Sequence, residues 1–144
     1  MSYFDNAATT YPKPDAVYSF MDSFYRNHGG SVGRGGYALA TTAKGLVDET
    51  RKLIQELMHC HAKQVIFTPT ATIALNMIIQ GAIVSGARSV YISPFEHNAV
   101  TRVLHHFEQL GQITVTELTV SESLEYDMVR IRYQFDAIRP DLVI

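Results

Sequence analysis

The stretch that decides the fold is Val65-Ile66-Phe67-Thr68-Pro69-Thr70-Ala71-Thr72-Ile73-Ala74-Leu75-Asn76. It opens with apolar, β-branched and aromatic residues, which predict a buried strand over 65–68. After a turn of small residues, an apolar run of helical length continues to about Ser85. The unpaired N–H groups and positive dipole end of such a helix can bind an anion. The alternative is an ordinary strand–helix turn with Thr72 as the N-cap, and the stretch alone does not separate the two.

The composition predicts one soluble globular domain. The chain has 144 residues, 47% hydrophobic and 18% charged, with a net charge of −2. This balance offers no basic surface, so we expect no nucleic-acid partner. No apolar run is long enough to span a membrane, and the N-terminus lacks the basic and apolar regions of a signal peptide. We therefore expect a cytoplasmic protein without membrane contact.

Before the opening stretch, the pattern predicts an arm and two helices. Residues 1–13 are expected to be extended, because the prolines at positions 12 and 14 disfavour helix before them. An apolar stripe predicts a first helix from Pro14 or Asp15 to about Tyr25. A second predicted helix covers about 39–58. Between them, residues 29–37 hold most of the glycines, which predicts a loop that turns sharply or lets another group approach its backbone.

After the opening stretch, helices and strands alternate. The predicted elements are helix 72–85, strand 89–93, helix 97–110 and strand 113–118, with Gly86 and Gly111 at helix C-terminal positions. This alternation favours an α/β fold with a parallel sheet and right-handed crossovers. Residues 128–138 fit a strand or a helix. We expect a helix, because one is due before the apolar strand at 141–144.

His97 is the clearest candidate for chemistry. It follows strand 89–93, and ligands bind beyond the carboxyl ends of parallel strands, where the turn at 70–72 should also lie. An imidazole there can stack on a planar cofactor or exchange a proton, or it can simply open its helix. His59, Cys60 and His61 are consecutive and cannot converge on one ion from a helix, so we predict no metal site.

Four motifs follow one another in a characteristic order along the chain. They are Tyr3-Phe4-Asp5-Asn6-Ala7-Ala8-Thr9-Thr10 with Pro12-Lys13-Pro14, Asn27…Gly33-Arg34-Gly35-Gly36-Tyr37, Phe67-Thr68-x-Thr70-Ala71-Thr72-x-x-x-Asn76, and Glu96-His97-Asn98-Ala99. Together they resemble the class V aminotransferase group, in particular the NifS-like cysteine desulfurases. The resemblance covers nearly the whole chain. It implies the fold-type I architecture of pyridoxal 5′-phosphate (PLP) enzymes, whose large domain is a three-layer αβα arrangement around a mainly parallel sheet. Residues 38–144 would be the N-terminal portion of that domain, and residues 1–37 an arm, a helix and a glycine-rich loop.

The resemblance also implies roles for individual residues. Ala71 and Thr72 would hold the PLP phosphate, largely through backbone N–H groups. His97 would stack on the pyridine ring as a cofactor-binding residue and transfer protons as a catalytic one. Ala7 and Ala8 would lie near the amino-acid substrate. Arg34 would sit in the loop at a homodimer interface.

Several functional residues of the family match no position in this chain. They are the Schiff-base lysine, the carboxylate beside the pyridinium nitrogen, the asparagine at the ring hydroxyl and the nucleophilic cysteine; Cys60 stands in another context. The resemblance therefore implies a truncated, N-terminal part of an enzyme that converts L-cysteine to L-alanine and enzyme-bound sulfur, inactive by itself. The alternatives are a selenocysteine lyase or another class V enzyme, and a non-catalytic remnant that binds phosphate or a partner.

The resemblance leaves strand 65–68 without neighbours. In the family's large domain, the matching strand lies across the sheet from the strands that match 89–93, 113–118 and 141–144. We therefore expect 65–68 to stay apart, to pair with a neighbour or to join another chain. The whole chain is expected to form a homo-oligomer or to associate with the missing portion.

Overall fold

The computed structural model describes residues 2–33 and 35–144. The chain divides into two compact units, Met1–Ile66 and Phe67–Ile144, which are described separately. The predicted boundary between residues 37 and 38 stays a prediction. Among the described residues, no helix combines the length and apolar character that a membrane crossing requires. The cytoplasmic location also stays a prediction.

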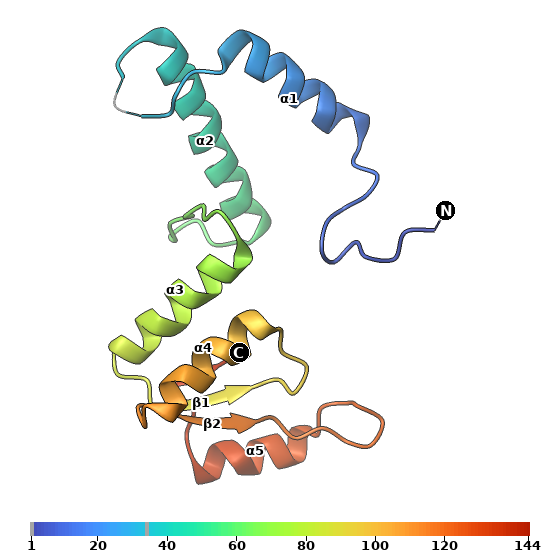
Figure 1. Cartoon of the computed structure of the whole chain (residues 1–144), viewed down its shortest axis with the longest axis vertical. Coiled ribbons are helices and arrows are strands. Elements are labelled where there is room, and N and C mark those ends of the chain that lie inside the picture. The colour runs from blue at the N-terminus through green and yellow to red at the C-terminus, as the bar shows by residue number, and fades with distance from the viewer. Residues whose placement is uncertain (1, 34) are drawn as a thin grey trace. The chain divides into compact units, whose positions relative to one another are not determined.

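The N-terminal unit contains the two predicted helices, α1 (Asp15–His28) and α2 (Ala38–Leu57) (Figure 1). They pack through apolar faces, and Phe20 and Phe24 of α1 line a groove with Leu46 and Val47 of α2. The expectation of an extended arm was wrong for its central part. Residues 6–8 form a turn in which the N–H of Ala8 donates to the carbonyl of residue 5 at 3.1 Å.

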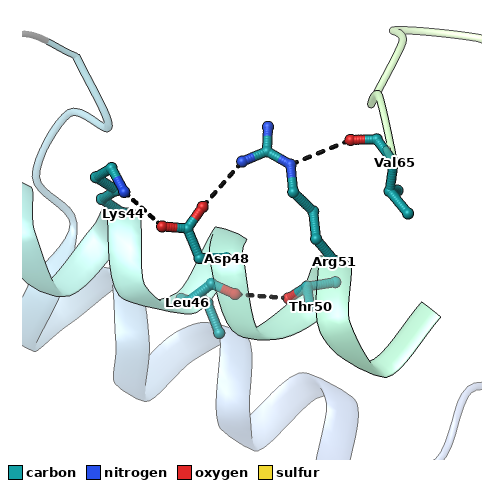
Figure 2. Close-up of polar contacts among 6 residues, drawn as sticks. All are labelled: Lys44, Leu46, Asp48, Thr50, Arg51 and Val65. Carbon is teal, nitrogen blue, oxygen red and sulfur yellow. Dashed lines mark hydrogen bonds and ion pairs between the residues drawn. The ribbon is translucent and has the colours of Figure 1, made fainter. Parts of the chain in front are cut away.

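The segment that follows α2 is tied back to that helix by side chains. The guanidinium of Arg51 donates from Nε to the carbonyl of Val65 at 3.2 Å, and Gln55 donates to the carbonyl of Lys63. Figure 2 shows that Arg51 also bonds Asp48, which accepts from Lys44 as well. The hydrogen bond from Lys44, aided by Arg51, lowers the pKa of Asp48.

The predicted strand over 65–68 is not formed. A strand requires a neighbour with which to exchange backbone hydrogen bonds. Here the carbonyls of Lys63 and Val65 accept from α2 side chains instead. Ile66 and Phe67 consequently remain 70% and 49% exposed.

The C-terminal unit is built on a parallel sheet, as predicted. Its strands are β1 (Ser89–Ile92), β2 (Thr114–Glu117) and β3 (Leu142–Val143), in the order β2-β1-β3. Val90 of β1 pairs with Val115 on one side and Leu142 on the other. All three strands run in one direction, so their carboxyl ends meet at a single edge.

Helices cover both faces of this sheet. Helices α3 (Ala71–Val84) and α4 (Asn98–Gln109) share a core with Val90 and Ile92. Between these two residues, Tyr91 points to the opposite face, where its hydroxyl donates to the carbonyls of Gln134 and Ile138 at the end of α5 (Met128–Ala137). The ambiguous segment is therefore a helix, and the unit has three layers.

Gly86 and Gly111 lie just beyond the C-terminal caps of α3 and α4, with positive φ angles of 112° and 67°. This left-handed region favours glycine, so both helix ends lie where the sequence predicts them.

Candidate functional site

The turn at 70–72 opens helix α3, but Thr70 rather than Thr72 is its N-cap. The Thr70 Oγ1 accepts from the N–H of Ile73 at 3.2 Å, and its backbone is extended (φ −148°, ψ 157°). This corrects the expected capping role of Thr72. With the cap two residues earlier, the N–H groups of Ala71 and Thr72 are the first two of the helix and donate to no acceptor in the described chain.

His97 is the N-cap of helix α4. Its Nδ1 accepts from the N–H of Ala99 at 3.1 Å, and the backbone is extended. A nitrogen that accepts carries no proton, so the neutral ring holds its proton on Nε2. His97 thus opens its helix, and the ring still presents Nε2, which has no hydrogen-bond partner among the described residues.

The two helix starts share one pocket of about 320 Å³. This volume lies at the lower end of the range of about 300–1,000 Å³ found for ligand sites. The lining residues come from the caps and first two turns of both helices: Thr72, Asn76, His97, Asn98, Ala99, Arg102 and Val103. The structure therefore brings the predicted Thr72 and His97 together, whereas Ala71 precedes Thr72 and does not line the pocket.

Asn76 joins the two helices at the pocket. Its Nδ2 donates to the carbonyl of Thr72 at 2.9 Å and lies 3.5 Å from the carbonyl of Ala99 on α4. The sequence places Asn76 in a motif without showing this contact, which links residues far apart along the chain. Asn76 thus lies between the first two turns of α3 and the start of α4.

Arg102 is a pocket residue that the sequence did not single out, and Asn98 was identified only as part of a motif. Arg102 lies one turn beyond Asn98 on α4 and forms no hydrogen bond or ion pair with a described residue. The signal that could have found it is this i, i+4 spacing from the helix start, which puts both residues on one face.

The remaining predicted site residues are not placed at the pocket. Ala7 and Ala8 belong to the N-terminal unit, so their position near a substrate stays a prediction. Arg34 lies outside the described residues. Across 2–33 and 35–144, no group of three or more His, Cys, Asp or Glu side chains could hold a metal ion.

The pocket has the chemistry of an anion site beside a flat ring. Its lining includes one guanidinium and no carboxylate. Two helix N-termini add partial positive charge, and the N–H of Asn98, like those of Ala71 and Thr72, has no acceptor in the part of the chain that the structure describes. These features suit a phosphate next to a group that can stack on the imidazole of His97.

The chain is similar to known proteins over most of its length. The class-V aminotransferase family matches residues 2–143. PbSufS of Plasmodium berghei (strain Anka) is 35% identical over an alignment of 102 positions that covers 67% of this chain and 19% of that protein. The cysteine desulfurase IscS of Methylococcus capsulatus (strain ATCC 33009 / NCIMB 11132 / Bath) is 27% identical over 146 residues, covering 99% of this chain and 35% of that protein.

A solved structure supports the fold. The apo cysteine desulfurase of Thermococcus onnurineus NA1 superimposes with a TM-score of 0.78 at 22% identity, covering 88% of this chain and 32% of that one. The chain thus spans about a fifth to a third of the length of these proteins. Because the family match extends over nearly all of its residues, this chain belongs to the class-V aminotransferase family.

Proposed function

We propose that the pocket between α3 and α4 binds the phosphate and ring of PLP. The observation that carries this proposal is that Thr72 and His97 line one pocket at two adjacent helix starts. A phosphate at a helix N-terminus is stabilised by free N–H groups and by the helix dipole. The imidazole of His97 lies in the same pocket and can stack on the ring.

The residues present fit the phosphate. The N–H groups of Ala71 and Thr72 are free to donate, and Arg102 supplies a cation without a competing partner among the described residues. The Thr70 Oγ1 accepts the cap hydrogen bond from the N–H of Ile73, which fixes the start of the helix. The shared core of α3 and α4 holds the two helix starts together, which preorganises the pocket.

PLP, when bound, supplies the electron sink for reactions of amino acids. Within that chemistry, His97 holds or moves a proton only at Nε2, because Nδ1 is occupied by the N–H of Ala99. Protonation of Nδ1 would break the cap of α4. The cap therefore fixes both the tautomer and the orientation of the ring.

We infer that the longer protein acts on an amino acid, with L-cysteine as the first candidate and selenocysteine as the second. The relatives named cysteine desulfurase support this substrate class. The C-terminal unit, which carries the pocket, contains no lysine and no cysteine. The tethering amine and the sulfur acceptor must therefore come from outside this unit, and we expect the 144-residue chain alone to bind without turning over. A purely phosphate-binding remnant is the non-catalytic alternative.

We further propose that the chain associates with a second copy or with the polypeptide corresponding to the rest of its relatives. Its accessible surface is 11267 Å². Two separate compact domains of these sizes would expose only about 8,900 Å². Outside the stripe of Thr72, Asn76 and Gln80, helix α3 is apolar. It nevertheless exposes four large apolar side chains, those of Ile73, Met77, Ile78 and Val84. Sedimentation showing only monomer at micromolar concentration would contradict this.

The binding proposal is tested with pyridoxamine 5′-phosphate, which carries the ring and phosphate of PLP but no aldehyde to react with surface lysines. Calorimetric titration should show saturable binding that inorganic phosphate competes away, and much weaker binding of pyridoxamine. Equal affinity for the two ligands would remove the phosphate site. When this chain is incubated with PLP and L-cysteine, neither sulfide nor alanine should form. Turnover would show that the tethering lysine and the nucleophilic cysteine of the family are not needed.

A further inference from the structure

A short hairpin after β2 reaches the carboxyl end of β1, close to the loop that carries His97. Val120 and Tyr126 form an antiparallel bridge, and the N–H of Ser121 donates to the carbonyl of Glu125 at 2.8 Å. The second bond of this bridge, from the N–H of Asp127 to the carbonyl of residue 119 at 3.0 Å, closes the base of the hairpin. The backbone therefore fixes where the Tyr126 side chain lies.

Tyr126 is joined to the His97 loop through Ser93. The Tyr126 hydroxyl donates to the buried Ser93 Oγ at 2.8 Å, and the same oxygen accepts from the N–H of Phe95 at 3.1 Å. The Phe95 and Tyr126 rings also meet edge-to-face, with centroids 6.3 Å apart. The backbone N–H of Ser93 is held in turn by the carbonyl of Ile144 at 3.0 Å.

We propose that Tyr126 is a positioning residue for His97. It is not among the residues that line the pocket, and its hydroxyl is bonded to Ser93. It acts through Ser93 and Phe95, which fix the turn immediately before the residue that caps α4. Through this turn, the Tyr126 hydroxyl sets the direction of the His97 ring. Its effect on ligand binding rests on the function proposed above, whereas its effect on the His97 ring can be measured without a ligand.

The arrangement explains why a hydroxyl is present at position 126. The Tyr126 ring is 45% exposed and packs on Phe95, which a phenylalanine could also do. Only the hydroxyl reaches the buried Ser93 Oγ. Removing the hydroxyl leaves the contact between the Phe95 and Tyr126 rings in place and breaks only the hydrogen bond to Ser93. The contribution of the hydrogen bond can therefore be measured separately from that of the ring contact.

The test compares Tyr126→Phe with Tyr133→Phe in the full chain. Tyr133 lies on α5, is 70% exposed, and its hydroxyl has no hydrogen-bond partner among the described residues. Tyr133→Phe is therefore a control that removes the same hydroxyl group without breaking a hydrogen bond. In the unliganded protein, NMR follows the amide of Ala99 and the ring nitrogens of His97. We expect Tyr126→Phe to shift these resonances and Tyr133→Phe to leave them unchanged.

With pyridoxamine 5′-phosphate as the probe, Tyr126→Phe should weaken binding about 3- to 10-fold, the effect of one lost hydrogen bond. Ser93→Ala should weaken binding at least as much, because it removes the acceptor of the Phe95 N–H as well as that of the Tyr126 hydroxyl. Adding Tyr126→Phe to Ser93→Ala should change little, because the Tyr126 hydroxyl then has no Ser93 acceptor to lose. A lowered melting temperature with unmoved Ala99 and His97 resonances would overturn the proposal. If the wild-type chain does not bind the probe, the proposed function fails, and the resonances of the unliganded protein still decide this inference.

Discussion

Replacing Ala71 with proline removes one proposed phosphate donor without removing a contact of the fold. Ala71 is the first residue of α3, and its N–H donates to no acceptor in the described chain. Proline is favoured at this helical position, where its missing N–H is unpaired anyway. The preceding residue, Thr70, has φ −148° and ψ 157°, which lies within the range allowed before proline.

The expected magnitudes differ for stability and binding. Because proline restricts the unfolded chain, Ala71→Pro should leave the free energy of unfolding unchanged or raise it by about 0.4–1 kcal/mol. A hydrogen bond to a charged group contributes roughly 1.5–3 kcal/mol. Its loss should therefore weaken binding of pyridoxamine 5′-phosphate by roughly 10- to 150-fold. Pyridoxamine, which lacks the phosphate, should be unaffected.

Calorimetry and urea unfolding measure the two effects separately. The control is Ala38→Pro, the same change at the first residue of α2, whose N-cap Tyr37 has φ −82° and ψ 157°. It should match Ala71→Pro in stability and leave binding intact. Unchanged affinity in a folded Ala71→Pro protein would refute the role of this N–H. Loss of folding in Ala71→Pro alone would refute the assignment of the helix start.

Three further predictions concern the site and the sheet. His97→Asn should preserve the α4 cap and the stability but lose affinity for pyridoxamine 5′-phosphate. His97→Ala should lose the affinity and also about 1 kcal/mol of stability in urea unfolding. Equal affinity in both variants and in the wild type would exclude a role of the His97 ring in binding. Arg102→Ala should weaken binding several-fold and reduce its salt dependence, while Arg132→Ala, on the exposed side of α5, should not; equal effects would indicate only general charge. The pKa of Asp141 is lowered, chiefly by the N–H of Ser89. A carboxyl whose pKa is lowered in the folded state stabilises the fold at pH values above its unfolded-state pKa of about 3.9, and this stability is lost as the pH falls through its folded-state pKa. Asp141→Asn should therefore flatten the curve of stability against pH below about pH 4. An unchanged curve would contradict this.

Local sequence patterns correctly predicted the helices, whose backbone hydrogen bonds are internal, and the strands whose neighbouring strands belong to this chain. Helices α3 and α4 follow from apolar runs closed by glycines at 86 and 111, whose positive φ angles confirm the predicted ends. Strand 65–68 was predicted from equally apolar residues and is absent, because a strand also requires a neighbour. The extended arm failed for a related reason: residues 6–8 form a turn through a backbone hydrogen bond that composition does not reveal.

The sequence predicted those residues of the candidate site that lie at the starts of helices. Thr72 and His97 each lie at a helix start after an apolar stretch, and the structure places both in one pocket. The contacts that organise the pocket join distant parts of the chain and were not predictable from local patterns. Asn76 reaches the carbonyl of Ala99, and Tyr126 reaches Ser93.

The most direct measurement of the central claim is an amide NMR titration of the chain with pyridoxamine 5′-phosphate. The account predicts saturable shifts centred on the amides of Ala71, Thr72 and Asn98, with much smaller shifts from pyridoxamine at the same concentrations. Shifts centred instead on α1 and α2, or equal shifts from both ligands, would contradict an anion site at the start of α3.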